Sequence, residues 1–397
     1  MKRHGHITIK SLLFAIIYIL LIKPAYITSI PLLNTTWNYL QLIPAIFSIY
    51  IILRRKLTKP TYLVIGLYSV FVVSRIVNGN FDIYYIFQII PYVVLPVLCD
   101  YWIDVYGSRS IVILYKVLFC YLFLNFVSIV FFPDGLYTAE SIAGYDAKCW
   151  FLGYKNPQIR MILPTLALGI TIYNRKRNGS IKLLFLFVIA GLSIVFVESI
   201  TGITAIVMFF GLAFMLKSEK KMLLRLFNPI VVIVIIVCIN LAFVVFSLQE
   251  SLLSPLQTLF SSKEFATFSH RTYVWQAGLL LIQSKPILGI GSTSFNSFLG
   301  FSVSHPHNYI MYVLLSGGII GLLLSLMFFY QTVSSMYKEK KLFESRLYIA
   351  LLIVILSMGI VESLTEFPLL YAILIVGYKI RKTNTELFTR LDGRYVP

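Results

Sequence analysis

The sequence predicts an all-α integral membrane protein with about twelve transmembrane helices. Of its 397 residues 58% are hydrophobic and only 13% are charged, and the mean hydropathy is +0.85. A soluble protein usually has about a quarter of its residues charged, and a disordered chain is poor in apolar residues. Both classes are therefore excluded, and the expected surroundings of the chain are the lipid bilayer.

Apolar runs of roughly the 20 residues needed to cross the hydrocarbon core occur along the whole chain. Because lipid offers no hydrogen-bond partner to a backbone amide, such runs must be helices. The last run is the shortest. The expected spans are, in order, 11–30, 37–53, 60–77, 83–99, 110–132, 158–173, 181–197, 200–216, 228–248, 307–330, 347–363 and 365–378.

The basic residues predict the orientation of these spans. With a cytoplasmic N-terminus, strict alternation puts every basic cluster inside: 25 of the 34 Lys and Arg residues are cytoplasmic, six are external, and Lys23, Arg75 and Lys116 lie within spans. This agrees with the positive-inside rule and predicts that both termini are cytoplasmic. The net charge of +18 is thus a topology signal, and no nucleic-acid partner is expected. No small-residue cleavage pattern follows Leu21, so the first run is expected to be a retained helix.

We expect one polytopic membrane domain, 1–397, with two long external loops, 133–157 and 249–306. The second loop, between spans 9 and 10, contains an apolar stretch from Arg271 to Ile282 that is too short to span, and it predicts a helix at the membrane interface. Long loops are where a membrane enzyme would build its site. No internal repeat of 20–50 residues supports an inverted-repeat transporter.

Arg271 opens that apolar stretch and is a candidate ligand of pyrophosphate, since a guanidinium presents a planar, permanently charged fork to phosphate oxygens. The alternative is an interfacial arginine that reaches to lipid headgroups. His307 stands where the chain re-enters the membrane, and its imidazole could take a proton from a sugar hydroxyl. The alternative for this residue is a solvated loop histidine, which is the favoured interpretation for His270 and His305.

Arg160, at the external end of the sixth span, is a candidate second cation or a helix-end anchor. Glu198, Glu362 and Glu366 lie on the same side and could position an acceptor, act as a base or pair with an arginine; the sequence leaves these roles open. The aspartates at 100 and 104 are interpreted as part of a cytoplasmic loop.

Neither a metal nor a cofactor is expected. His305 and His307 flank a proline and lack a third ligand, and the four cysteines, Cys99, Cys120, Cys149 and Cys238, have no paired spacing. The sequence contains no phosphate-binding loop and no external DxD-like pair, which favours a lipid-linked sugar donor over a nucleotide sugar.

Two blocks of residues resemble the signature of the O-antigen ligase and O-antigen or capsular polysaccharide polymerase superfamily. The first lies in the loop between spans 9 and 10, and the second lies in span 10. Order and spacing match over about 271–324, and the layout of spans extends the likeness over the chain. The residues are Arg271, Trp275, Pro286, Gly289, Gly291 and Phe295, then His307, Asn308 and Tyr309, and the glycines Gly317, Gly318 and Gly321.

The resemblance implies a metal-independent, inverting glycosyl transfer from an undecaprenyl-pyrophosphate-linked oligosaccharide at the outer face of the cytoplasmic membrane. Arg271 would hold the pyrophosphate and His307 would be the catalytic base or would position the acceptor; Arg160, Asn308, Tyr309, Trp275 and Glu198 would bind substrate. Many relatives carry a Ser-Arg pair between spans seven and eight, where this chain has Glu198 and Ser199. That departure leaves Arg160 as the expected second cation.

The function expected from this resemblance is polysaccharide polymerase, acting in exopolysaccharide, capsule or O-antigen synthesis. An O-antigen ligase, which transfers finished glycan to a lipid A core, is the alternative. A lipid-linked oligosaccharide flippase is the alternative of another class; it would place charges along a central path, and only Lys23, Arg75 and Lys116 qualify. A chain-length regulator and a flippase are the expected protein partners.

Overall fold

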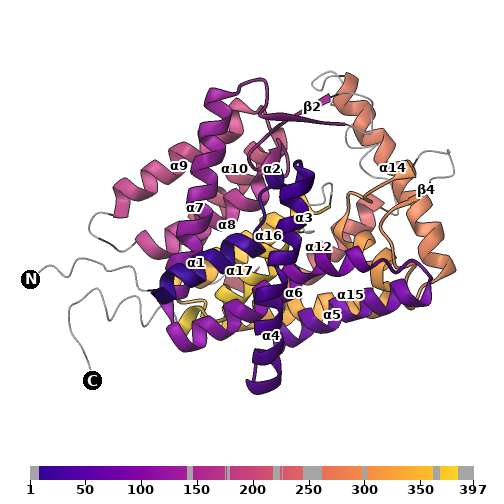
Figure 1. Ribbon diagram of the computed structural model, residues 1–397, viewed down its shortest axis with the longest axis horizontal. Coiled ribbons are helices and arrows are strands. Elements are labelled where there is room, and N and C mark those ends of the chain that lie inside the picture. Colours follow the sequence, from indigo (N-terminus) through magenta and orange to yellow (C-terminus); the bar gives the residue numbers. More distant parts are fainter. Residues whose placement is uncertain are drawn as a thin grey trace, which may run out of the picture.

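The computed structural model describes residues 9–140, 146–174, 176, 179–217, 224–225, 227–244, 262–296, 302–360 and 367–382. Within these ranges the chain is mostly helical (Figure 1). The helices are α1 (Ile9–Leu21), α2 (Ala25–Thr28), α3 (Pro31–Leu40), α4 (Leu42–Arg54), α5 (Lys59–Val77), α6 (Ile83–Tyr106), α7 (Ser108–Phe131), α8 (Ile159–Tyr173), α9 (Gly179–Phe196), α10 (Ile200–Lys217), α12 (Pro229–Val244), α14 (Ser262–Ser284), α15 (Tyr309–Lys338), α16 (Phe343–Met358) and α17 (Pro368–Tyr378).

Apolar helices confirm an all-α membrane protein. Among the described residues, seven helices are long and apolar enough to cross a bilayer: α3 and α4 taken together as Pro31–Arg54, then α5, α6, α7, α9, α10 and α15. Four shorter apolar helices, α1, α8, α12 and α17, coincide with further predicted spans. The number of twelve crossings and the sidedness of the termini stay predictions.

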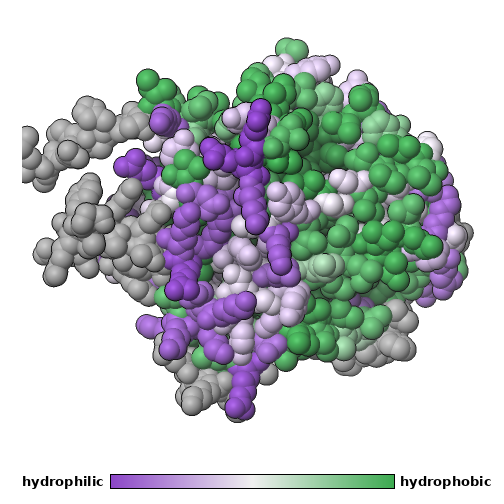
Figure 2. All heavy atoms as spheres, turned by 90° about the horizontal axis from the view of Figure 1, so that it is seen from below, coloured by the Kyte–Doolittle hydropathy of each residue, from purple (hydrophilic) through white to green (hydrophobic). Residues whose placement is uncertain are grey.

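The side chains on the outside of the bundle form an apolar surface. Figure 2 shows a broad hydrophobic region on one face, with hydrophilic surface on both of its flanks. Large apolar side chains stand exposed on helix after helix, for example Leu53, Val77, Phe131 and Phe214. A water-soluble protein rarely exposes so large a contiguous apolar area, whereas lipid tails cover it without cost. The chain is therefore an integral membrane protein.

Two helix boundaries differ from the sequence-based expectation. The first span was expected to run to residue 30, but α1 ends at Leu21 and Pro24 caps a separate short helix, which leaves Lys23 in the break between them. The fourth span was expected to end at residue 99, but α6 continues to Tyr106, so Asp100 lies in a helix and the loop interpretation is wrong.

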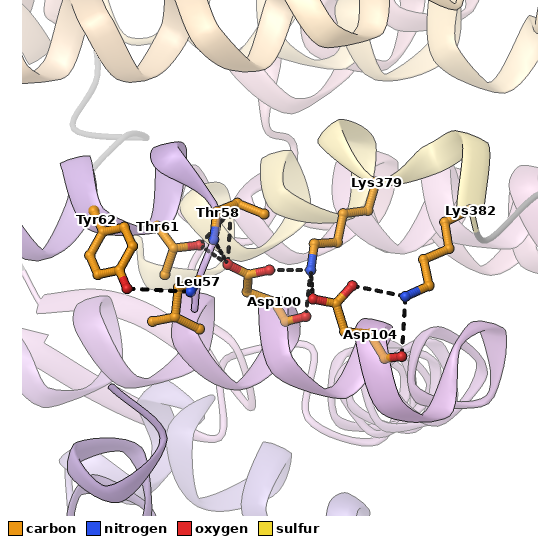
Figure 3. A network of polar contacts seen from close by, with 8 residues as sticks. All are labelled: Leu57, Thr58, Thr61, Tyr62, Asp100, Asp104, Lys379 and Lys382. Carbon is orange, nitrogen blue, oxygen red and sulfur yellow. Dashed lines mark hydrogen bonds and ion pairs between the residues drawn. The ribbon is translucent and has the colours of Figure 1, made fainter. Parts of the chain in front are cut away.

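The extension of α6 is explained by the partners of Asp100 (Figure 3). Its buried carboxylate accepts hydrogen bonds from the backbone N–H of Thr58 (2.7 Å) and the Thr61 hydroxyl (2.6 Å), and it forms an ion pair with buried Lys379 at the end of α17. Lys379 Nζ also lies 2.7 Å from Asp104 Oδ2. A buried carboxylate is tolerated when it is paired and hydrogen-bonded in this way. The cluster ties α5, α6 and α17 together at one end of the bundle.

The first external loop contains a small sheet. Strands β1 (Tyr137–Glu140), β2 (Asp146–Trp150) and β3 (Gly153–Tyr154) pair antiparallel in that order. The indole N–H of Trp150 donates to the backbone oxygen of Phe132 (2.8 Å), which fixes the sheet to the end of α7. The second long loop contains α14, which includes the stretch 271–282 that was expected to be helical and extends it at both ends, and a two-stranded ladder of β4 (Phe295–Asn296) and β5 (Ser302–Val303). The position of α14 at the membrane interface stays a prediction.

The packing of α15 determines where the long external loop folds. It runs along α5, while α14 and α12 pack on it and α17 packs along α6. In Figure 1, α14 and β4 lie at one end of the molecule and α9 lies at the other. The segment between α14 and α15 is therefore brought back over the ends of α5 and α15.

Candidate active site

Helix α15 is broken at Gly318, close to its external end. The backbone there has φ 58° and ψ −155°, a conformation that is essentially restricted to glycine. A Cβ at this position would also lie 2.2 Å from the backbone oxygen of Ile287. In the sequence, Gly317, Gly318 and Gly321 are candidate packing positions for a neighbouring helix. Gly318 has a second role, which is to interrupt the helix and expose its carbonyl groups.

Residues 285–291 fill this break. The amides of Ile290 and Gly291 donate to the backbone oxygen of Leu315 (2.9 and 3.1 Å), and the amide of Ile319 donates to the backbone oxygen of Pro286 (2.9 Å). These bonds satisfy backbone groups that the interrupted helix leaves open, as a membrane-embedded chain requires. The motif Lys285–Gly291 is therefore a structural plug of α15.

The plug is also tied to the end of α5. The side-chain amide of Asn78 donates to the backbone oxygen of Gly289 (3.0 Å), and the amide of Asn80 donates to that of Ile290 (3.0 Å). A Cβ at Gly291 would lie 2.8 Å from the backbone of Arg75. This close approach places Arg75 directly beside the motif that the sequence singled out.

His307 is fixed by the residues that follow it. It is half-buried and has a left-handed backbone (φ 50°), and Asn308 behind it caps α15 by accepting from the amide of Met311 (3.0 Å). The Asn308 side chain also donates to Asn240 Oδ1 (2.8 Å) and to the backbone oxygen of Ile360 (3.1 Å). His307 is thus presented at the N-terminal end of a well-anchored helix.

Trp275 and Tyr309 support the same segment from either side. The Trp275 side chain is fully buried, and its indole N–H donates to the backbone oxygen of Pro306 (2.8 Å). Tyr309 is 5% exposed, its amide donates to the backbone oxygen of Gly359 (2.9 Å), and its hydroxyl lies 2.5 Å from that of Ser325. Asn308 is 1% exposed. The hydrogen bonds of these three residues hold the segment of His307 in place, and their expected contact with substrate stays a prediction.

Arg271 lies on α14, one turn before Trp275, and is half-buried. Residues four apart share a helix face, so the bond from Trp275 to Pro306 brings the turn of Arg271 toward the segment of His307. The structure therefore places the predicted pair on two elements that meet.

A large polar cavity lies beside these residues. Its volume is about 620 Å³, which is the size of a small-molecule or cofactor site. His305, whose ring centroid lies 6.4 Å from that of His307, lines it together with Ser316 of α15. Amide side chains and tyrosine rings form much of the remaining wall: Asn34, Asn38, Gln41, Gln88, Tyr68, Tyr84, Tyr85, Tyr92 and Tyr312.

Two cations of this cavity, Lys23 and Arg75, were not among the predicted site residues. Lys23 lies in the break between α1 and α2, and Arg75 lies in the last turn of α5. The sequence placed both within spans, as the residues a transporter would need. The overlooked signal was the cost of a charge near the hydrocarbon core, because such residues mark functional sites when they face a polar cavity.

The other predicted residues lie apart from the cavity. Arg160, half-buried in the first turn of α8, lines a small apolar pocket that shares Phe367 with the cavity wall. Glu198 is exposed in the turn between α9 and α10 with φ 54°, and its backbone oxygen accepts from Lys155 (3.3 Å). Glu198 does not line the cavity, and its contact with substrate stays a prediction.

The remaining sequence candidates fall where the structure says little. Glu362 and Glu366 lie outside the described residues, and only the backbone of His270 is described. Within the described ranges, no three His, Cys, Asp or Glu side chains converge as metal ligands would.

Comparison with known proteins links this site to a family. Residues 185–326, which include α14, the plug, His307 and the break in α15, match the family model described as O-antigen ligase. The match supports the superfamily assignment that the blocks at Arg271 and His307 predicted. No curated protein and no solved structure matched the chain.

Proposed function

Because residues 185–326 match the family model described as O-antigen ligase, we propose that the chain is a polysaccharide polymerase that joins lipid-linked repeat units at the outer face of the cytoplasmic membrane. The observation that carries the proposal is the polar cavity of about 620 Å³ whose wall includes His305, with a ring centroid 6.4 Å from that of His307. Sugar hydroxyls bind well to amide side chains and tyrosine rings, which form much of its wall. A saccharide acceptor, and not only a lipid, therefore fits the site.

The proposed reaction is the attack of an acceptor hydroxyl on the anomeric carbon of a glycan linked to undecaprenyl pyrophosphate. The new bond joins the acceptor oxygen to that carbon, the bond from the carbon to the pyrophosphate oxygen breaks, and the hydroxyl proton passes to His307 as general base. Undecaprenyl pyrophosphate leaves with the electron pair. Displacement from the opposite face inverts the anomeric carbon.

Arg271 acts on the leaving group. Negative charge grows on the pyrophosphate as its bond to the sugar breaks, and a guanidinium can offer two parallel N–H donors to phosphate oxygens. The position of Arg271 on an interfacial helix suits a donor whose lipid tail stays in the membrane. Among the described residues, the exposed Tyr273 and Leu280 of α14 give the helix apolar surface for that interface.

The test is the size of surface polysaccharide in a deletion strain complemented with variants. Arg271→Ala and His307→Ala should each abolish long chains, whereas Lys148→Ala should not, because Lys148 is an exposed residue whose partner is Asp134 in the first external loop. Each variant must reach wild-type abundance in the membrane. Wild-type chain length in either Arg271→Ala or His307→Ala would refute the catalytic assignment.

The deletion strain itself separates polymerase from the other activities. A polymerase deletion leaves single repeat units on the lipid carrier. Full-length chains left on the carrier would instead identify a ligase, and repeat units confined to the cytoplasmic leaflet would identify a flippase. Either of these two results contradicts the proposal.

A further inference from the structure

Two amide side chains hold Lys23 in the cavity wall. Its Nζ donates to Asn34 Oδ1 (2.6 Å) and Asn38 Oδ1 (2.8 Å), both on α3. An ammonium group has three donors, so one remains after these bonds are made. The amides hold the side chain in one position and leave its charge uncancelled.

Arg75 is held across the same cavity by an aromatic ring. Its guanidinium carbon lies 3.7 Å from the centroid of the Tyr85 ring on α6. This cation–π contact holds the guanidinium in the cavity wall, and a guanidinium can present parallel N–H donors to a planar anion. The backbone of Arg75 is held by its close packing against Gly291.

Neither cation is neutralised by a described carboxylate. The ion pairs among the described residues lie elsewhere, at Lys148–Asp134 and in the cluster around Asp104 and the C-terminal end of α17. Half-buried cations that line a polar cavity are costly without a partner of opposite charge, so this cavity favours an anionic group. Lys23 and Arg75 line the cavity and Arg271 does not, so the two cations are assigned a ligand other than the pyrophosphate proposed for Arg271.

We propose that Lys23 and Arg75 bind an anionic substituent, a carboxylate or a phosphate, on the saccharide that enters the cavity, so that the chain acts on acidic repeat units. The inference rests on the proposed polymerase function and names its substrate class. A saccharide is favoured over a lipid headgroup because amides and tyrosine rings accompany the two cations, and Gln88 and Tyr312 are suited to hydroxyl groups.

The first test is the composition of the polysaccharide that the host strain produces. The proposal requires at least one acidic constituent per repeat unit, such as a uronic acid, a pyruvyl group or a phosphate diester. A neutral polymer overturns the proposal. A neutral polymer would not contradict the proposed polymerase function, because that function is tested separately by the His307→Ala variant.

The second test uses membranes that contain the chain and the lipid-linked repeat unit extracted from the deletion strain. The substrate is supplied either intact or with its anionic group removed, by carbodiimide activation and borohydride reduction for carboxylates or by a phosphomonoesterase for phosphates. Both treatments leave the pyrophosphate linkage to the lipid in place. Removal should lower turnover by wild-type membranes about tenfold or more, the loss of one charge-assisted interaction. Lys23→Gln and Arg75→Gln should lower turnover of the intact substrate to a similar extent.

The decisive comparison is the combination of both changes. In the Lys23→Gln/Arg75→Gln double variant, removing the anionic group should cause no further loss, because its partner is already gone. If removal of the anionic group lowers turnover equally in the double variant and in wild type, the proposal is overturned. A double variant that turns over the intact substrate at the wild-type rate also overturns it. Lys148→Gln is the matched control and should respond to the altered substrate as wild type does, since its side chain is 55% exposed.

Discussion

At the residue scale, the position of His307 depends on hydrogen bonds to neighbours that never touch substrate. Its left-handed backbone costs about 1–3 kcal/mol and persists only where surrounding contacts impose it. Replacing Trp275 by Phe removes the donor to the backbone oxygen of Pro306 and leaves that buried acceptor without it, a cost of about 1–3 kcal/mol. We expect shorter polysaccharide chains and a lower melting temperature, measured by gel electrophoresis of the polymer and by thermal unfolding of the purified protein.

The matched control is Trp150→Phe. Trp150 is also buried and donates its indole N–H to a backbone oxygen, that of Phe132, at the same distance of 2.8 Å, but in the sheet between α7 and α8. It should lower the melting temperature and leave chain length unchanged. If both variants shorten the polymer equally, Trp275 has no special link to His307.

The sequence singled out His307 and Arg271 because the chemistry of an imidazole or a guanidinium follows from residue type. It could not indicate that Trp275, Asn308 and Tyr309 anchor the segment of His307, since aromatic and amide side chains serve equally to bind a glycan and to anchor a helix. Their hydrogen bonds in the folded chain show the anchoring role. It missed Lys23 and Arg75 as a pair because 52 positions separate them and only the packing of α1, α3, α5 and α6 brings them to one cavity.

At the element scale, the break in α15 and its plug form one unit. Gly318→Ala puts a Cβ 2.2 Å from the backbone oxygen of Ile287 and forces a side chain into a backbone conformation that only glycine adopts readily. We expect the plug to be displaced and both membrane abundance and polymer length to fall severely, as measured by immunoblot and polymer analysis. The loss is expected even though no catalytic side chain changes.

Gly191→Ala in α9 is the control, because a Cβ there meets nothing within 4 Å. Alanine in a helix interior is favoured over glycine by about 0.5–1 kcal/mol, so this variant should be as abundant as wild type or more so. Similar losses in both glycine variants would mean that the break is not a special element. From sequence, the glycines were expected to allow close helix packing; the helix break was not foreseen, since it depends on residues 285–291 that lie apart from α15 along the chain.

At the scale of the whole molecule, contacts join helix ends that the charge pattern assigns to the same side. The cavity brings together His305, expected outside, with Lys23 and Arg75, which were expected within spans, while Asp100 and Lys379 meet at ends expected inside. The positive-inside rule used only composition, yet these contacts are consistent with it. What composition could not indicate is that two of the three cations within spans would line one cavity.

Sidedness can be measured with a membrane-impermeant thiol reagent on intact cells. Ser294→Cys, exposed in the loop near β4, should be labelled without permeabilisation. Lys56→Cys, exposed between α4 and α5, should be labelled only after the cells are permeabilised.

The unmodified chain gives the background labelling of its four native cysteines. Of these, Cys149 lies in the external sheet, where burial raises the pKa of its thiol, so it should stay protonated and react slowly. Labelling of both engineered cysteines from the same side would break the alternation on which the twelve-span arrangement rests.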